Sequence, residues 1–438
     1  MISRRTVLAG LGASGLSSLD ARAPDGFVRV DGHRFLLDGN PYRYCGTNMW
    51  YGAYLGSPGP LGNRDRLKRE LDNLGKLGLG NLRVLGSGEL SPLKNSLKYT
   101  FRGPKPPYNE DLLAGLDYLL AEMGKRGMKA VIYLNNFWEW SGGMVTYQYW
   151  TNGGHYINLG DPAHPWPEFA DFSAQFYTMP AAIALYEDYV AAIVGRTNTV
   201  TGRKYRDDPA IMSWQLANEP RPGGGLAKAP FAAFYAWIAR SADFIKHHDP
   251  NHLVSTGNEG LKGCLESEEC VVRAHSPANI DYVTFHLWPL NWSWVDAGDL
   301  KGTYADCEAK SRDYIATHLK IAGQLDKPAV LEEFGFVRDG GAYGIDLPTT
   351  WRDRFYRMVF DAVEASAGQG GPFAGTNFWA WGGAGRAQHP DFMMGPNDTS
   401  YVGDPPQEPQ GRNSVFDCDA STLAIIRGHA RRLRKLPA

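Results

Sequence analysis

Strand-like and helix-like patterns alternate along this chain, and this alternation limits its possible folds more than any other feature. Short apolar runs are followed by longer segments in which apolar residues recur every three or four positions. The expected strands lie at residues 42–48, 81–85, 129–135, 211–218, 253–257, 282–286, 329–333 and 375–381. The expected helices lie at residues 64–77, 109–126, 181–195, 231–247, 307–325, 350–367 and after 421, with a hairpin at 27–39 before them. This order predicts a parallel sheet with helices packed outside it.

The number of strands favours a closed barrel over an open sheet. Eight strand–helix units close into a (β/α)₈ TIM barrel, although the helix between the fifth and sixth strands is short or irregular. An open, doubly wound sheet is the alternative, but no GxGxxG or P-loop follows a strand. The chain has no low-complexity linker, and its Gly/Pro-rich stretch at 390–411 indicates a long loop after the last strand. We therefore expect a single α/β domain over residues 24–438, with long loops at the C-terminal face of the barrel.

Two of the expected strands end in carboxylates. Residues 214–220 read Trp-Gln-Leu-Ala-Asn-Glu-Pro, and residues 330–336 read Val-Leu-Glu-Glu-Phe-Gly-Phe. A carboxylate at the end of a buried strand costs free energy unless it is paired or hydrogen-bonded. If the fold brings the two segments together, they supply the pair of carboxylates that glycoside hydrolysis needs.

Other chemically active side chains follow the same pattern. The active site of a TIM barrel lies at the C-terminal ends of its strands, where turn-forming residues would otherwise be expected. Instead, these ends carry aromatic, amide and charged residues: Trp50, Arg83, Asn136, Trp138, Asn218, Glu219, Glu259, His286, Trp288, Glu333 and Trp379. The sequence therefore predicts a substrate-binding ring around the two carboxylates.

At these positions the chain resembles the clan A glycoside hydrolases, specifically family 5. The Asn-Glu-Pro and Glu-Phe-Gly elements, His286 and Trp379 are similar to motifs shared across that clan. The segments at 46–50 (Gly-Thr-Asn-Met-Trp), 135–143 (Asn-Asn-Phe-Trp-Glu-Trp-Ser-Gly-Gly) and 255–260 (Ser-Thr-Gly-Asn-Glu-Gly) resemble the endo-β-1,4-mannanase subfamily. The resemblance covers nearly the whole of residues 24–438.

The resemblance implies a role for each main residue. Glu219 would be the acid/base, with a pKa raised by the nearby nucleophile, and Glu333 would be the nucleophile of a retaining mechanism. Arg83 would keep Glu333 ionised, and Asn218 would bind the 2-hydroxyl of the sugar. His286 would orient Glu219 or the substrate. Trp379 would form the floor of the subsite that holds the distorted sugar.

Three positions leave alternatives open. Strand alternation should send only one of Glu332 and Glu333 into the barrel, and the family pattern favours Glu333. Glu259 follows an Asn as Glu219 does, but lacks the following Pro, so substrate contact or a structural role is expected there. Many family members have Tyr where this chain has Trp288. An indole N–H can donate a hydrogen bond but cannot accept one, so the bonding at the nucleophile should differ.

Residues 1–23 have the features of an export signal. Arg4 and Arg5 precede a weakly apolar stretch, and Ala-Arg-Ala at 21–23 offers a small-residue cleavage site. This order resembles a twin-arginine signal and predicts a periplasmic or secreted mature protein. A tail with a chance arginine pair is the alternative. No later apolar run approaches the ~18 residues that span a bilayer, so we expect no membrane contact for the mature chain.

The composition argues against several function classes. A net charge of -2 gives no basic footprint for nucleic acid. The five cysteines form no CxxC or zinc-ligand set, so we expect no metal and no cofactor, although Cys264 and Cys270 could pair after export. Aromatic residues are abundant, with 13 Trp, 22 Tyr and 19 Phe, as suits a protein that stacks on sugars. We expect a monomer.

The sequence thus predicts a retaining endo-β-1,4-mannanase acting on mannan, galactomannan or glucomannan. An exo-acting β-mannosidase and an endo-β-1,4-glucanase are alternatives within the family, and a non-catalytic sugar-binding barrel is a more remote one. Long loops at 138–170, 291–304 and 382–412 could block one side of the cleft and favour exo action. The presence of both Glu219 and Glu333 argues against the non-catalytic reading.

Overall fold

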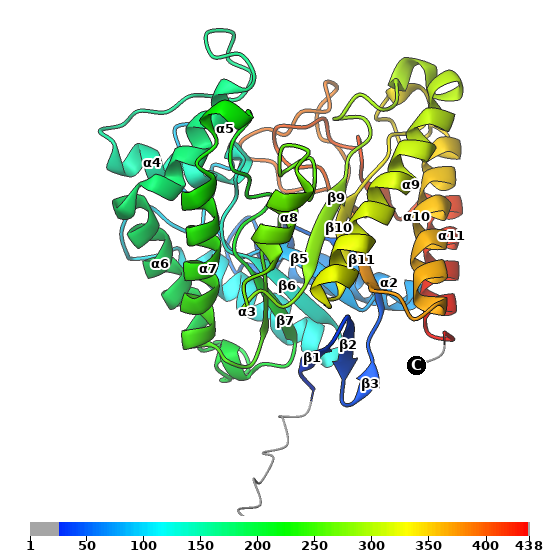
Figure 1. Ribbon diagram of the computed structural model, residues 1–438, viewed down its shortest axis with the longest axis horizontal. Coiled ribbons are helices and arrows are strands. Elements are labelled where there is room, and N and C mark those ends of the chain that lie inside the picture. The colour runs from blue at the N-terminus through cyan, green and yellow to red at the C-terminus, as the bar shows by residue number, and fades with distance from the viewer. Residues whose placement is uncertain (1–25, 437–438) are drawn as a thin grey trace, which may run out of the picture.

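The computed structural model describes residues 26–436, so the predicted export signal lies outside the described residues. Eight parallel strands form the central sheet (Figure 1). They are β4 (Tyr44–Asn48), β5 (Asn81–Leu85), β6 (Lys129–Tyr133), β7 (Ile211–Gln215), β8 (Leu253–Ser255), β9 (Val283–Leu287), β10 (Ala329–Phe334) and β11 (Phe373–Phe378).

The sheet closes into a barrel. Its hydrogen-bonded order is β8-β7-β6-β5-β4-β11-β10-β9, which leaves β8 and β9 at the two ends. Backbone hydrogen bonds join these ends, because the Asp281 N–H donates to the Val254 carbonyl at 2.8 Å and the His286 N–H to the Glu259 carbonyl at 3.1 Å. The predicted (β/α)₈ fold is confirmed.

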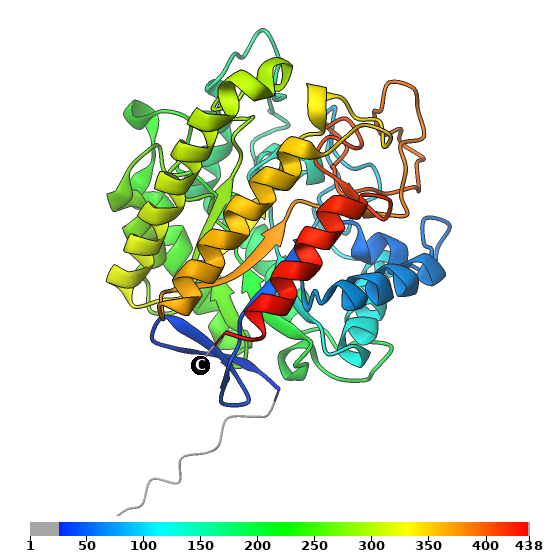
Figure 2. The same cartoon turned by 90° about the vertical axis from the view of Figure 1, so that its right-hand side faces the viewer.

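Helices surround the barrel, as the periodicity predicts. They are α1 (Gly52–Gly56), α2 (Arg64–Leu77), α3 (Glu110–Lys125), α4 (Gly143–Thr151), α5 (Glu168–Ala174), α6 (Pro180–Val194), α7 (Phe231–His248), α8 (Glu268–His275), α9 (Leu300–Leu325), α10 (Thr350–Gly368) and α11 (Ala420–Leu433). Figure 2 shows α9, α10 and α11 side by side on the outside of the sheet. The weakest predicted connection, between the fifth and sixth strands, contains the eight-residue helix α8.

The sequence of α2 shows why such a helix forms and where it ends. Leu67, Leu71 and Leu74 recur at four- and three-residue spacing, and all three are fully buried. The Asn63 side chain caps the first turn by accepting from the Arg66 N–H, and Gly78 ends the helix with a φ of 87°.

The N-terminal hairpin closes the bottom of the barrel. Strands β1 (Val28–Asp31), β2 (Arg34–Leu37) and β3 (Asn40–Pro41) form a small antiparallel sheet at the end of the barrel opposite the long loops (Figure 1). From the hairpin, Val28 and Phe35 pack against Tyr44, Tyr282 and other residues at the lower ends of the strands. This plug leaves the opposite, C-terminal ends of the strands for the site.

The long loops at that face are more ordered than the sequence suggests. Helix α9 begins at Leu300, seven residues earlier than predicted, because the Asp299 side chain caps it by accepting from the Gly302 N–H. The predicted loop 138–170 also contains α4 and the start of α5. The segment after β11 is a long loop, as expected, tied down by the short pair β12 (Trp381–Gly383) and β13 (Val415–Phe416).

The remaining elements are short 3₁₀ turns: η1 (Glu139–Ser141), η2 (Gln175–Thr178), η3 (Tyr205–Asp207), η4 (Leu226–Lys228), η5 (Ala297–Asp299) and η6 (Asp339–Gly341). Among the described residues, no helix combines the length and the apolar character needed to cross a bilayer. Cys264 and Cys270 are both buried and are not joined by a disulfide.

Candidate active site

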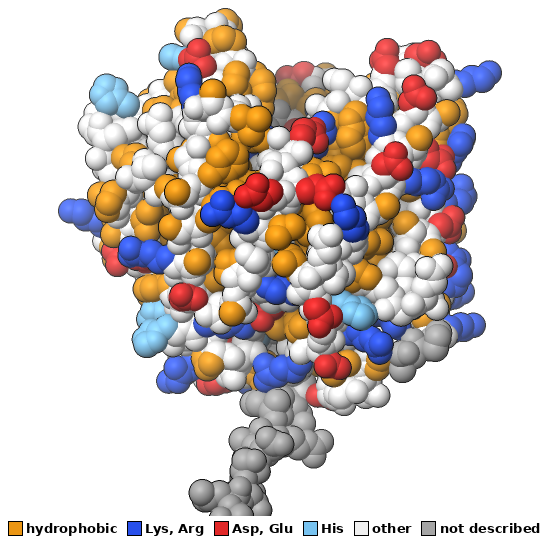
Figure 3. All heavy atoms as spheres, in the orientation of Figure 1, with side chains coloured by type: hydrophobic (Ala, Val, Ile, Leu, Met, Phe, Trp, Pro, Cys, Tyr) orange, Lys and Arg blue, Asp and Glu red, His pale blue; other side chains and the backbone are white. Residues whose placement is uncertain are grey.

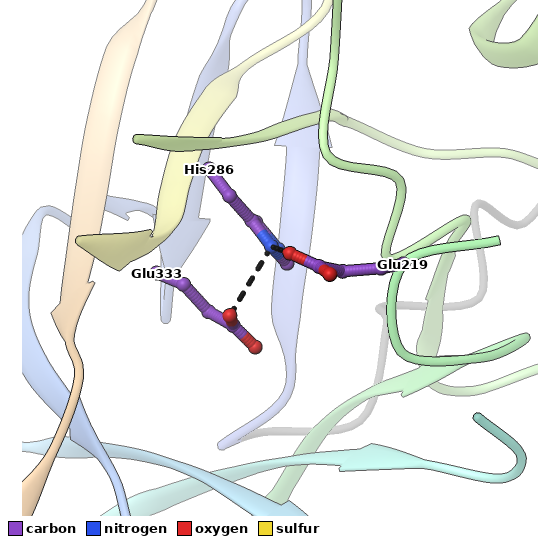
Figure 4. Close-up of side chains that lie close together, drawn as sticks. All are labelled: Glu219, His286 and Glu333. Atoms are coloured by element: carbon purple, nitrogen blue, oxygen red, sulfur yellow. Dashed lines mark hydrogen bonds and ion pairs between the residues drawn. The ribbon is translucent and has the colours of Figure 1, made fainter. Parts of the chain in front are cut away.

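Two carboxylates and one imidazole meet at the C-terminal end of the barrel. Glu219 follows β7, Glu333 lies on β10 and His286 on β9. One oxygen of each carboxylate and a ring nitrogen of His286 all lie within 4.8 Å of one another. Figure 4 shows the imidazole between the two carboxylates, with Nδ1 at 2.6 Å from Glu219 Oε1 and 3.3 Å from Glu333 Oε2. The fold thus brings together the two carboxylates that lie apart in the sequence.

A strained backbone aims Glu219 into the site. Its φ of 51° is left-handed, a conformation that a non-glycine residue adopts only at a cost, and its N–H donates to the Gly257 carbonyl at 2.9 Å. The carboxylate is held by His286 on one oxygen and by the Trp138 Nε1–H on the other, at 2.5 Å. Glu219 therefore has a fixed orientation before any substrate arrives.

Arg83 anchors the other half of the site from below. This fully buried guanidinium donates to Glu333 Oε1 at 2.5 Å, to Asn218 Oδ1 at 2.8 Å and to Asn48 Oδ1 at 3.1 Å. A charge-assisted hydrogen bond of this kind favours the ionised carboxylate. The predicted pairing of Arg83 with Glu333 is present, and the same arginine also orients Asn218.

Both glutamates at the end of β10 point into the barrel, so the expectation that only one does is wrong. The pairing of β10 with β9 shifts register between Leu331 and Glu333, and this bulge breaks the alternation of side chains. Glu332 is fully buried and accepts from Gln215 Nε2 at 2.5 Å, and its pKa is raised by burial. Glu333 is the one that reaches the cavity.

The charge of His286 overturns the expectation of a raised pKa for Glu219. Burial alone would lower the pKa of His286, but Glu333 and Glu219 raise it to about 10. Burial raises the pKa of Glu219, yet the hydrogen bond and charge of His286, with help from Arg221 and Trp138, outweigh burial and lower it. The proton of this pair is therefore held on His286, beside Glu219.

The same three side chains have atoms close enough to hold a metal ion. Metal binding would require a bare Nδ1 on His286, because a ligating nitrogen cannot carry a proton. That nitrogen is hydrogen-bonded to Glu219, and the raised pKa of His286 keeps it protonated. The cluster is suited to holding protons.

A cavity of about 510 Å³ opens above the two carboxylates. Seven predicted residues line it: Trp138, Asn218, Glu219, Glu259, Trp288, Glu333 and Trp379. It also contains residues that the sequence reasoning missed: Glu139, Trp140, Leu159, Trp166, Arg221, Asn291, Trp292, Pro405, Gln407 and Glu408. Its wall is rich in indoles and carboxylates, which suits the apolar faces and the hydroxyls of a sugar.

Two predicted substrate contacts lie behind the wall. Trp50 is fully buried, with its Nε1–H donated to the Gly403 carbonyl at 3.1 Å, and its ring packs edge-on against Trp140, which does line the cavity. Asn136 is also buried and accepts from Asn218 Nδ2 at 3.1 Å. Both support residues that face the cavity.

Trp288 takes the place expected for it beside Glu333. Its Nε1–H donates to Glu333 Oε2 at 3.3 Å, so the indole replaces the hydrogen bond that a Tyr would make. Its ring also meets Trp379 at a centroid distance of 6.1 Å, in an edge-to-face arrangement. These two indoles form the wall of the cavity beside Glu333.

Glu259 lines the opposite part of the cavity, and it is partnered there. It forms a buried ion pair with Arg221 and accepts from the Trp292 Nε1–H at 3.1 Å. Burial raises the pKa of Glu259 to about 7 despite the charge of Arg221. Arg221 could have been predicted as a site residue, because it lies two residues after Glu219. Glu408 could not, because no pattern in the loop around it marks it.

A (β/α)₈ barrel with two carboxylates within 4.8 Å of each other, at the ends of its fourth and seventh strands, defines a glycoside hydrolase. The chain belongs to glycoside hydrolase family 5: the family model described as "GH family 5 beta-mannosidase-like" matches residues 25–438.

Known proteins resemble the chain over most of its length. Mannan endo-1,4-beta-mannosidase 3 of Oryza sativa subsp. japonica is 30% identical, over 80% of this chain and 72% of that protein. The family 5 mannosidase of Rhizomucor miehei, a solved structure, has a TM-score of 0.85 and 36% identity, and covers 94% of this chain and 98% of its own. The endo-1,4-beta-mannanase of Rhizomucor miehei has a TM-score of 0.67 and 25% identity, over 93% and 99%.

Proposed function

We propose that this glycoside hydrolase cleaves β-1,4-mannosidic linkages in mannan-type polysaccharides by an endo-acting, retaining mechanism. The separation of the catalytic pair carries the mechanistic part, because carboxylate oxygens within 4.8 Å of each other fit the short spacing of retaining enzymes and not the ~6.5–9.5 Å of inverting ones. The plant relative named a mannan endo-1,4-beta-mannosidase supports the substrate class.

In the first step, Glu333 attacks the anomeric carbon while the glycosidic oxygen leaves with a proton from Glu219. The bond to the leaving sugar breaks as the bond to the Glu333 carboxylate forms. Nδ1 of His286 lies 2.6 Å from Glu219 Oε1, so the proton held by this pair can pass to the carboxylate that delivers it. The hydrogen bonds from Arg83 and Trp288 hold the Glu333 carboxylate in position.

In the second step, water takes the place of the departed sugar. Glu219, now ionised, accepts a proton from that water, whose oxygen attacks the anomeric carbon and frees Glu333. Asn218 is held by Arg83 and Asn136, and its position next to Glu219 suits a bond to the 2-hydroxyl of the sugar. We assign Trp379 to the floor beneath the same sugar.

The decisive test replaces Glu333 and, as a control, its neighbour Glu332. The variant Glu333→Ala should lose activity by about a thousandfold or more, and azide should restore part of it as an α-mannosyl azide. The variant Glu332→Gln, matched in position, should keep the ability to form the covalent intermediate. If Glu333→Ala hydrolyses mannan at the wild-type rate, the assignment of the nucleophile is wrong.

Exo-acting β-mannosidase activity is the second candidate function. The family model is described as beta-mannosidase-like, and the solved mannosidase of Rhizomucor miehei has also been solved in complex with mannosyl-fructose. In this protein, Gln407 and Glu408 from the long loop after β11 line the cavity. There they would block the path of a polysaccharide on one side. A time course on mannohexaose separates the candidates: mixed oligomers indicate endo action, and mannose alone indicates exo action.

We also propose that the protein is exported through a twin-arginine signal. The support is the ordered Arg4-Arg5 pair, weakly apolar stretch and Ala-Arg-Ala site in residues 1–23. A variant with Arg4→Lys and Arg5→Lys should stay in the cytoplasm at its full length. Export of that variant at the wild-type level would refute a twin-arginine route.

A further inference from the structure

One carboxyl group in the wall of the catalytic cavity lacks the partners that the others have. Glu139 lines the cavity and is only 3% exposed, and its Oε2 is buried without a hydrogen-bond partner. The other four glutamates of the wall each form an ion pair: Glu219 with His286, Glu259 with Arg221, Glu333 with Arg83 and Glu408 with Arg412. No ion pair within the described part of the chain includes Glu139.

These surroundings favour the neutral form of Glu139. Burial raises its pKa to about 7, although a hydrogen bond from its own backbone N–H acts in the opposite direction. A neutral carboxyl group has an O–H donor and a carbonyl acceptor, so it can bond a sugar hydroxyl in either sense. A buried polar atom without a partner costs free energy, and a ligand that brings a hydroxyl to Oε2 removes that cost.

Backbone hydrogen bonds fix the turn that carries Glu139. Within η1, the Gly142 N–H donates to the Glu139 carbonyl at 2.8 Å. From the neighbouring loop, the Leu97 N–H donates to the Trp140 carbonyl at 2.8 Å. The backbone at Glu139 is therefore held in place before a substrate arrives.

The two sequence neighbours of Glu139 place it beside the sugar that is attacked. Trp138, the residue before it, donates to Glu219 Oε2 at 2.5 Å. Trp140, the residue after it, meets Trp379 edge-on at a centroid distance of 6.4 Å. This turn thus runs from the proposed acid/base to the floor assigned to the attacked sugar, and Glu139 lies between them.

The rim above the cavity is apolar. Trp166 and Leu159 both line the cavity, and they are 57% and 36% exposed. Figure 3 shows apolar side chains gathered on the part of the rim where α5 lies in Figure 1. A sugar that fills the cavity below this rim excludes water, and a hydrogen bond to Glu139 is stronger in such surroundings of low dielectric constant.

We propose that Glu139 is a specificity-determining residue whose carboxyl group holds the 3- or 6-hydroxyl of the attacked sugar. The proposal rests on the proposed function. In that function Asn218 takes the 2-hydroxyl, and the oxygen at C4 carries the next sugar of a β-1,4-linked chain. The hydroxyls at C3 and C6 are the two that remain for Glu139.

The test combines variants of Glu139 with substrates that each lack one hydroxyl. The substrates are 2,4-dinitrophenyl β-mannoside, whose leaving group departs without help from an acid, and its 3-deoxy, 4-deoxy and 6-deoxy analogues. Glu139→Ala removes the carboxyl group, whereas Glu139→Gln keeps a donor and an acceptor. Glu187→Ala is the matched control, because Glu187 is a 9% exposed glutamate of α6 that pairs with Arg240 outside the cavity wall.

We expect Glu139→Ala to lower kcat/KM for the parent mannoside about tenfold, the size of one lost hydrogen bond. Removing the 3- or the 6-hydroxyl should cost the wild type about as much. The same removal should cost Glu139→Ala less than about twofold, because the bond is already absent. Glu139→Gln should stay within about threefold of the wild type. Glu187→Ala should show the wild-type loss with every analogue.

A structural role of Glu139 would lower kcat/KM equally for all four substrates. Equal losses for the 3-deoxy and 6-deoxy analogues in the wild type and in Glu139→Ala would therefore overturn the proposal. A loss that Glu139→Ala reduces only for the 4-deoxy analogue would overturn it as well. Either result leaves the proposed function intact, because mannan hydrolysis and the Glu333→Ala variant test that function. A wild-type enzyme that hydrolyses neither mannan nor the parent mannoside would refute both.

Discussion

His286 sets the charge balance between the carboxylates of Glu219 and Glu333. Two ionised carboxylates this close would repel, and each would hold its proton more tightly. The imidazolium between them offsets that repulsion, which is why its own pKa rises to about 10. Glu219, the proposed acid/base, therefore shares a proton with His286.

The positive charge of His286 makes the stability of the fold decrease as the pH rises. The pKa of His286 is 6.5 in the unfolded chain and about 10 in the folded protein, so the charged imidazole stabilises the fold. This contribution to stability is complete below pH 6.5 and fades as the pH rises toward 10. The variant His286→Asn lacks this contribution at every pH. We expect the difference in melting temperature between wild type and variant to shrink steadily over that interval.

The control for this experiment is a second buried histidine. His318 has its pKa lowered to about 4, chiefly by burial, so it is neutral in the folded and the unfolded chain above pH 6.5. Replacing it in His318→Asn should lower the melting temperature by an amount that does not change with pH. If both variants show the same pH trend, His286 is not the titrating group.

At the same scale, the sequence predicted the placement of residues carried by short motifs. The meeting of Glu219, Glu333 and Arg83 could be predicted because each lies on or just after a strand, and parallel strands of a barrel bring their C-terminal ends together. Glu408 could not be predicted, because a long loop placed it in the cavity. The position of Trp50 was also beyond the sequence, since a strand-end indole can face either the cavity or the packing behind it.

At the scale of elements, the loop between β12 and β13 builds one wall of the cavity. Within it, Asp404 is fully buried and accepts from the Gly411 N–H at 2.7 Å, the Asn413 N–H at 2.8 Å and the Ser414 hydroxyl at 2.5 Å. These bonds tie together the two ends of the segment that carries Gln407 and Glu408. The sequence predicted a long loop here but not the hydrogen bonds of Asp404 that fold it. It did not predict the bulge in β10 either, because neither feature follows a periodic pattern.

The loop's dependence on Asp404 can be measured directly. Asp404→Ala leaves several buried N–H groups without an acceptor, so we expect it to lower the free energy of unfolding by about 3 kcal/mol. It should also raise KM, because Gln407 and Glu408 lose their support. Asp404→Asn keeps one carbonyl acceptor and should fall between that variant and the wild type in urea unfolding and in KM. Equal effects of both substitutions would mean that charge, not the set of hydrogen bonds, holds the loop.

At the scale of the whole molecule, the two ends of the barrel have different roles: one carries the site and the hairpin closes the other. The alternation of strands and helices was enough to predict the barrel, because eight such units have few other ways to bury their apolar faces. The sequence predicted the hairpin at its start but not its place beneath the barrel. There, Phe35 meets Tyr282 edge-on at a centroid distance of 5.3 Å, and the Tyr282 hydroxyl donates to Glu332 at 3.3 Å.

Phe35, Tyr282 and Glu332 thus connect the hairpin to the site, and the hairpin could affect activity as well as stability only through these contacts. Phe35 is buried at the foot of the barrel, so Phe35→Ala should lower the free energy of unfolding by about 3–5 kcal/mol. Arg83 and Gln215 hold Glu332 and Glu333 independently of Tyr282, so kcat/KM at a temperature well below unfolding should stay at the wild-type value. Leu37→Ala, half-buried in the same hairpin, should cost less stability and also leave activity unchanged. A fall in kcat/KM for Phe35→Ala without a matching fall for Leu37→Ala would instead mean that Tyr282 and Glu332 transmit the packing of the plug to the nucleophile.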